Sequence, residues 1–253
     1  MRNTIEADEE MLYSDKEIHF DESLTIEGRA VFENCKIYCC ENGNGSNIEI
    51  EEDGEVQFIN CEITFCGIGV SKKKNHEFWF INSDNGSMTI KDCKLYYLHN
   101  FATGSFNELE VSGSEFINCM SGIFSTDTDN LGIVKDCRFL SRKLPDFLKA
   151  EDEDEDEDVD ENDEDEYEDE DEDEDEEIYS NKALLKKVSG PLIEGYYEIS
   201  DCTFEFGTKV NIYALEIDNT SSASNCTFIN DESVPVERLE DYTTCIHCIF
   251  NTL

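Results

Sequence analysis

The hydrophobic and polar residues of this chain follow one short pattern that returns about eight times. Its centre is an anchor, usually a cysteine, that follows an Asn or Asp and stands two positions before an apolar residue, as in FINCEI at 58–63. Another apolar residue stands three positions before the anchor, and a further one often stands five before it. The anchors are Cys35, Cys61, Cys93, Ser114, Cys137, Cys202, Cys226 and Cys248.

The spacing of these positions predicts two short β-strands joined by a sharp corner. Side chains two positions apart point to the same face of a strand, which explains the apolar pairs on either side of the corner. The spacing of three across the corner breaks this alternation, so the residue before each anchor must turn the chain. Asn, Asp, Gly and His tolerate the left-handed backbone angles of such a turn. These residue types occupy all the predicted corners, which are Asn34, Asn60, Asp92, Gly113, Asp136, Asp201, Asn225 and His247.

Most intervals between anchors are 21 to 26 residues, and a period of this size with variable insertions is typical of a solenoid. The phrases SLTIEGRAVFENCKI at 23–37 and EIEEDGEVQFINCEI at 49–63 resemble the parallel β-helix of the pectin-lyase-like superfamily. The resemblance covers 18–140 and about 190–253. It implies an all-β fold, a right-handed single-stranded parallel β-helix solenoid of about eight coils. A leucine-rich repeat is the main alternative, but its L-x-x-L-x-L phrase is missing.

The twelve cysteines allow three interpretations: a disulfide framework, a metal site or a stacked core position. Equivalent residues of stacked parallel strands lie about 4.8 Å apart, whereas disulfides need Cβ atoms about 3.5–4.5 Å apart. We therefore expect a ladder of buried, reduced thiols, with no metal and no cofactor. Zinc at the single CxxC, Cys245 to Cys248, is the weaker interpretation because a structural zinc site needs four ligands. The cysteines off the anchor positions could bind a metal or be oxidised, and these are Cys39, Cys40, Cys66 and Cys119.

The formal net charge of −43 is concentrated in segment 151–177, which holds 24 of the 62 acidic residues and no basic one. Such a run cannot bury apolar surface, so we expect a disordered insertion in a single domain formed by 1–150 and 178–253. One interpretation of the run is a solubilising loop without a binding role. Its functional interpretation is a binding segment for a basic protein, or loosely for divalent cations. Acidic residues spread along the run represent this candidate site: Glu151, Asp158, Glu166 and Glu177.

The rest of the chain is also acidic, with 38 acidic residues (62 − 24) against 19 basic ones, so nucleic acid and anionic membrane surfaces are disfavoured partners. Enzymes of the resembled superfamily act on acidic polysaccharides, but their Gly-His-Gly, Asn-Thr-Asp and Arg-x-Lys motifs are missing. No catalytic residue is therefore predicted. The aromatic residues Trp79, Tyr96 and Tyr97 could bind a glycan. We predict a non-catalytic scaffold or binding module; the alternative is a carbohydrate-active enzyme, lyase-like or glycoside-hydrolase-like, with an unrecognised site.

The first residues, MRNTIEADEEMLYSD, lack an apolar signal-peptide core, and no run approaches the roughly 18 apolar residues of a membrane span. A cytoplasmic location is therefore expected, which also suits reduced thiols. The last anchor, Cys248, stands five residues from the final Leu253. An uncapped last strand would present an open edge, so end-to-end assembly of identical chains is a further expectation.

Overall fold

The computed structural model describes residues 3–20, 22–39, 47–65, 79–98, 100–119, 123–126, 130–140, 190–206, 212–217, 221–230 and 245–252. All regular elements in these ranges are β-strands, and every strand pair is parallel. The all-β parallel architecture predicted from the sequence is confirmed. Segment 151–177, with Glu151, Asp158, Glu166 and Glu177, lies outside the described residues, as do Cys40 and Cys66.

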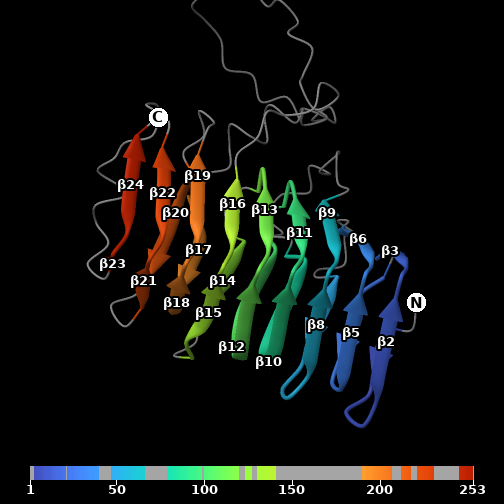
Figure 1. Ribbon diagram of the computed structural model, residues 1–253. Helices are drawn as coiled ribbons and strands as arrows, with labels where there is room; N and C mark the ends of the chain where they lie inside the picture. Colours follow the sequence, from blue (N-terminus) through green and yellow to red (C-terminus); the bar gives the residue numbers. More distant parts are fainter. Residues whose placement is uncertain are drawn as a thin grey trace, which may run out of the picture.

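The strands form three ladders, which the chain visits in a fixed order (Figure 1). The first ladder contains β1 (Thr4–Ile5), β4 (Leu24–Ile26), β7 (Ile48–Ile50), β10 (Ile81–Lys91), β12 (Ala102–Ser112), β14 (Phe124–Thr126), β17 (Gly190–Gly195) and β20 (Ile212–Ile217). The second contains β2 (Glu10–Ser14), β5 (Arg29–Glu33), β8 (Glu55–Ile59), the later halves of β10 and β12, β15 (Gly132–Lys135), β18 (Tyr197–Ser200), β21 (Ser222–Ser224) and β23 (Cys245–Ile246). The third contains β3 (Glu17–His19), β6 (Lys36–Cys39), β9 (Glu62–Phe65), β11 (Lys94–Tyr96), β13 (Glu115–Ile117), β16 (Arg138–Leu140), β19 (Thr203–Phe206), β22 (Thr227–Asn230) and β24 (Ile249–Thr252).

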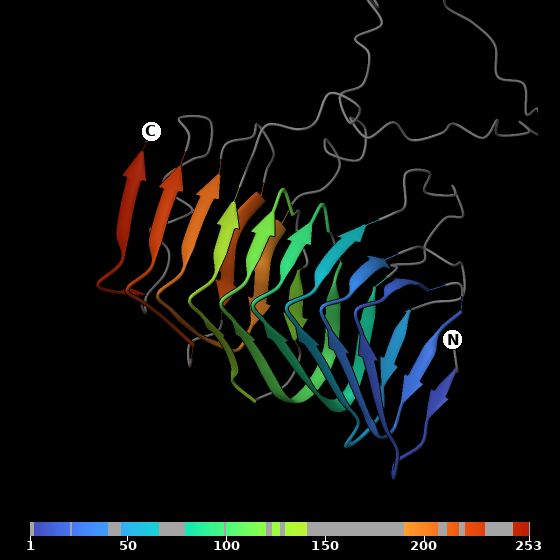
Figure 2. The ribbon, with the colours of Figure 1, turned by 45° about the vertical axis from the view of Figure 1, so that its right-hand side comes forward.

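We call one visit to the ladders a pass and number the passes along the chain, so that β1 to β3 form pass 1 and β23 and β24 form pass 9. Because β10 and β12 each run through the first and second ladders, these two ladders join into one 15-stranded sheet. The third ladder is a separate nine-stranded sheet. Figure 2 shows the bend between the second and third ladders recurring from pass to pass along the molecule.

The bend is the corner predicted from the sequence. All eight predicted corner residues have a left-handed backbone, with φ between 52° at Asn60 and 61° at Gly113. The strand–corner–strand prediction is confirmed. A ninth corner at Asp15, φ 54°, precedes Lys16, and was missed because the anchor there is not a cysteine. About eight coils were expected from the repeated phrases; the described strands begin at Thr4 and form nine passes.

The first pass departs from the repeated pattern at Tyr13 and Lys16. Tyr13 stacks on Phe32 of pass 2, with ring centroids 4.8 Å apart. The Lys16 ammonium lies 5.4 Å from the centroid of the Tyr13 ring. A cation and a phenol ring therefore occupy, in pass 1, the positions that hold a cysteine or serine and an apolar residue in later passes.

The core lies between the ladders and consists of stacked columns. The predicted inward residues three before the anchors are buried wherever their side chains are described: Phe32, Phe58, Ile90, Val111, Val134, Ile199 and Ala223. Those two after the anchors are buried as well: Ile37, Ile63, Leu95, Phe116, Phe139, Phe204 and Phe228. Rings at 116, 139, 204 and 228 stack in one column, with successive centroids 4.4, 4.6 and 5.0 Å apart. Parallel in-register pairing places like residues over one another and so builds these columns.

The cysteines at the anchors are core residues. Six of the seven are buried, Cys248 is half-buried, and all are free thiols. The expected core position is confirmed for the six buried anchor cysteines. Cys39, expected to be available for metal binding or oxidation, is buried as well, and burial raises the pKa of its thiol well above the ordinary value. Because the thiolate is the reactive form, Cys39 is an inert core residue.

Candidate functional site

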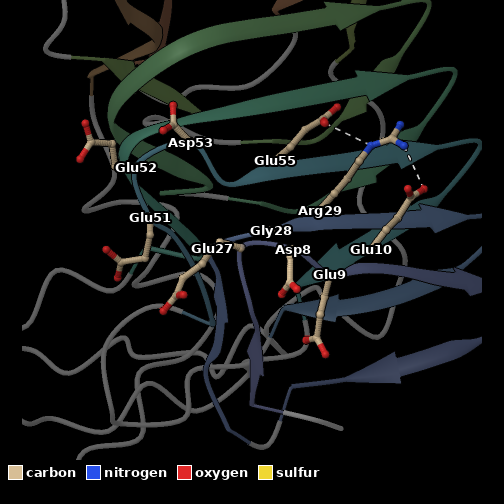
Figure 3. Close-up of a pocket in the computed structure, with 11 residues that line it drawn as sticks. Asp8, Glu9, Glu10, Glu27, Gly28, Arg29, Glu51, Glu52, Asp53 and Glu55 are labelled. Carbon is tan, nitrogen blue, oxygen red and sulfur yellow. Dashed lines mark hydrogen bonds and ion pairs between the residues drawn. The ribbon is translucent and has the colours of Figure 1, made fainter.

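The described residues form an acidic groove at the turns between the first and second ladders (Figure 3). Its volume is about 740 Å³, and it extends over the first three passes. Figure 3 shows the labelled carboxylates spread over successive turns, with Arg29 between Glu10 and Glu55. The lining residues are Ala7, Asp8, Glu9, Glu10, Glu27, Gly28, Arg29, Glu51, Glu52, Asp53 and Glu55.

The local sequence builds the groove by stacking tight turns. The turn of pass 3 closes with a hydrogen bond from the Gly54 amide to the Glu51 carbonyl at 2.9 Å. A side chain at Gly54 would place its Cβ 2.2 Å from the carbonyl oxygen of Ile26 in the preceding pass. Gly28 is equally restricted, since its Cβ would lie 2.2 Å from the carbonyl oxygen of Glu6. The glycines therefore let consecutive turns approach closely, and this brings the acidic turn residues of three passes together.

The electrostatics of the groove are strongly unbalanced. Its lining has eight carboxylates and one guanidinium, a formal charge of −7. Glu10, Arg29 and Glu55 are register partners on β2, β5 and β8. Arg29 Nη1 lies 2.9 Å from a Glu10 oxygen, and its Nε lies 3.1 Å from a Glu55 oxygen. The single cation of the lining is thus shared by two glutamates, and the other six carboxylates are exposed or half-exposed.

The groove is suited to binding cations rather than to acid–base catalysis. None of its eight acidic residues is buried. A carboxyl group that serves as a general acid is usually held in a buried, apolar setting. Nor does the described part of the chain contain a group of three or more His, Cys, Asp or Glu residues arranged to hold a metal ion. What the groove offers is a field of exposed negative charge.

Sequence reasoning missed this groove. Its signal lies in EADEE at 6–10, EGR at 27–29 and EEDGE at 51–55, which place acidic residues at the same turn of three successive passes. In an acidic chain such phrases are not distinctive by themselves. These phrases can be recognised as one site only when the register of the first ladder is known, because that register places Glu27 beside Glu51.

The three aromatic candidates are only partly brought together. Tyr96 ends β11 and Tyr97 follows it, with ring centroids 6.3 Å apart and planes tilted by 35°. Trp79 stands two residues before β10 and is half-buried. No ring contact within the described ranges joins Trp79 to either tyrosine. Phe80 and Ile81 are buried, as the alternation around Trp79 predicts.

A comparison with family models, with curated proteins and with solved structures finds no match to this chain. Membership of the pectin-lyase-like superfamily therefore remains a prediction from the repeated phrases. Within the described ranges, the structure contains no helix of the length and apolarity needed to cross a membrane.

Proposed function

We propose that this chain is a non-catalytic binding module, a right-handed single-stranded parallel β-helix solenoid that presents acidic surfaces to a basic protein. The solenoid is supported by the parallel pairing of all the strands and by the fixed order in which the chain visits the three ladders. Its handedness is supported by the general rule that crossovers between parallel strands are right-handed in about 98% of cases. Corners at Asn and Asp fit the tight bends of the pectin-lyase-like superfamily.

The acidic groove is the observation that supports a basic partner. Eight exposed or half-exposed carboxylates converge on about 740 Å³ with one arginine among them. Clefts lined by charge of one sign concentrate ligands of the opposite sign and accelerate their association. An extended segment rich in Lys or Arg matches the groove, since it can place several cations along the stacked turns of passes 1 to 3.

The polyacidic run is proposed as a second contact for the same partner. It starts at Glu151, 11 residues after Leu140 ends β16, and stands between passes 6 and 7. With 24 carboxylates in 27 residues it attracts basic segments without selecting one sequence. Divalent cations would bind the run loosely, because selective calcium sites need a fixed cage of oxygen ligands.

Binding of a fluorescent 12-residue Lys/Arg peptide, measured by anisotropy at low and at physiological salt, tests the proposal. Its acetyl-lysine and citrulline analogue provides the uncharged control. We expect micromolar binding of the charged peptide that weakens as salt is added. Substituting Glu51→Gln, Glu52→Gln and Asp53→Asn together should weaken binding about tenfold, taking about 0.5 kcal/mol for each exposed charge pair.

A remote triple variant separates the groove from the overall charge. Glu108→Gln, Glu194→Gln and Glu198→Gln remove three exposed carboxylates outside the groove. They should weaken binding less than twofold. Equal losses in both triple variants would show that only net charge matters, and the groove would lose its role. Deletion of 151–177 measures the contribution of the run. If the charged peptide and its uncharged analogue bind equally, the proposed function is wrong.

A further inference from the structure

Tyr97 occupies a backbone conformation that tyrosine rarely takes. Its φ is 56°, in the left-handed region, where a bulky side chain is a genuine outlier. Thirteen described residues other than glycine have a positive φ, and eleven of them are Asn or Asp. The other two are His247 and Tyr97. Because such outliers carry a conformational cost, they point to a requirement other than the turn itself.

The next pass shows what the turn alone requires. Tyr96 pairs with Ile117, so Tyr97 is equivalent in register to Asn118, which has a φ of 52°. The amide of Tyr97 donates to the carbonyl of Ile117 at 3.1 Å, and the amide of Asn118 donates to that of Leu140 at 2.8 Å. Asparagine therefore makes the same turn with the same ladder bond. Nothing in the backbone explains a tyrosine at 97.

The ring of Tyr97 is not part of the core. Tyr97 is half-exposed, whereas the following Leu98 is buried. Its ring partner is Tyr96, at 6.3 Å, which stands on the outward row of the third ladder between Thr64 and Ile117. The pair is therefore a surface feature.

Two carboxylates lie near Tyr96. Partial burial raises the pKa of Tyr96, and the negative charges of Glu62 and Glu115 raise it further. Glu115 accepts a hydrogen bond from Arg138 at 2.9 Å, whereas Glu62 makes no ion pair with any residue in the described ranges. Lys94 is the register neighbour of both glutamates, and Lys36 is the register neighbour of Glu62 on the other side. The Tyr96 ring thus lies near two carboxylates, and Tyr97 is its ring neighbour.

We propose that Tyr96 and Tyr97, with Glu62, bind one arginine side chain of the basic partner; this inference rests on the proposed function. A guanidinium stacks on aromatic faces and pairs with carboxylates, which a tyrosine pair beside a glutamate provides together. Tyrosine and arginine are also among the residues that dominate the energetics of protein interfaces. The tyrosine at position 97 is kept at a cost in stability because its ring is needed for binding.

The location of the pair fits the same partner. Tyr96 ends β11, and β16, which leads through Leu140 toward the polyacidic run, is two strands further along the third ladder (Figure 1). Two interstrand spacings amount to about 10 Å. Tyr96, Ile117 and Leu140 are register partners on successive strands, so Leu140 lies about this distance from Tyr96.

The test combines stability and binding in the full-length chain. Tyr97→Asn copies Asn118, and we expect it to raise the melting temperature by about 2–4 °C, because the left-handed strain is relieved. The same change should weaken an Arg-rich peptide about fivefold, as expected for one lost cation–π contact, and a Lys-rich peptide less. Tyr97→Phe keeps the ring and should retain both wild-type properties. Tyr38→Asn removes an outward tyrosine of pass 2 and should leave peptide affinity unchanged.

Each other result has a definite meaning. If the wild-type chain binds the Arg-rich peptide and Tyr97→Asn binds it equally well, the tyrosine inference is wrong while the proposed function stands. If Tyr97→Asn lowers the melting temperature, the ring is structural and the inference is overturned. Loss of binding to a neutral glycan array in Tyr97→Asn, without loss of peptide binding, would assign the rings to a glycan. If the wild type binds no basic peptide, both proposals fail together.

Discussion

The aromatic column of the third ladder provides a direct test of how the core is held together. Phe204 is fully buried, and its ring lies between those of Phe139 and Phe228, with planes 7° and 6° from parallel. Phe204→Ala removes that ring from between strands whose spacing the ladder fixes, so the cavity cannot collapse. Core Phe→Ala changes cost about 3–5 kcal/mol. We expect the upper half of this range, because two stacked pairs are lost, each contributing about 0.5–1.5 kcal/mol.

Phe204→Leu separates the volume of the ring from its stacking. Leucine is compatible with the position, since Leu95 occupies the same row of the ladder in pass 4. The leucine side chain retains most of the apolar volume but neither ring contact, so we expect a loss of about 1–3 kcal/mol. The difference of about 2 kcal/mol between the two variants then combines the lost burial of the remaining apolar volume with the cavity left behind.

Equilibrium urea unfolding, followed by far-UV circular dichroism and by tryptophan fluorescence, measures both variants. Trp79 is the sole tryptophan and stands in pass 4, three passes from Phe204. In a stacked array each unit is stabilised by its neighbours, so we expect both probes to shift together with an unchanged m value. Equal losses for the two variants would refute the cavity argument. A shifted dichroism midpoint with an unshifted fluorescence midpoint would refute coupling along the ladder.

Three further predictions concern the turns, the corners and the thiols. Gly28→Ala should destabilise the chain by about 1–3 kcal/mol in thermal unfolding, because its Cβ would lie 2.4 Å from the carbonyl oxygen of Glu9. Asp201→Ala should cost about 1–2 kcal/mol at φ 55°, whereas Asp201→Gly should cost less in the same urea titration; the reverse order would contradict the corner assignment. Burial raises the pKa of Cys119 to about 12 from 9.0, so the unfolded thiol ionises first and stability should fall between these pH values; Cys119→Ser should fall less, and an equal fall would exclude this thiol.

The corners and the inward columns could be predicted from the sequence because both are encoded within a few residues. A left-handed residue flanked by two strand periodicities is a local pattern, and it recurs with the same chemistry from Asn34 to His247. The first pass could not be recognised in the sequence because Lys16 stands at the anchor position, where most later passes have a cysteine. The first ladder could not be recognised for another reason. The connections that lead into its strands differ in length, as the one that ends at Asn47 and the one that ends before Gly190 show. Alternation alone cannot assign such strands a register.

The candidate sites were less predictable because each depends on neighbours distant in sequence. Glu10, Arg29 and Glu55 meet only through the register of three strands. Tyr97 was recognised as an aromatic candidate, but its unusual position becomes evident only when its φ is compared with that of Asn118. Composition indicated an acidic chain without showing where the charge converges.

The recurring cysteine is explained by the corner it follows. The Cys61 thiol lies 3.3 Å from the Phe32 carbonyl of the preceding pass, and the Cys61 amide donates to the Cys93 sulfur of the next pass at 3.3 Å. The Cys93 amide in turn donates to the hydroxyl of Ser114 at 3.0 Å. From pass 2 onward an anchor side chain must therefore be small, must satisfy a buried amide next to the corner and must pack in an apolar column. Cysteine meets all three needs, because a thiol is a weak hydrogen-bonding group and a compact hydrophobe. Since this role accounts for the anchor thiols without redox chemistry, the surface charge and the tyrosine pair are the features on which function is to be sought.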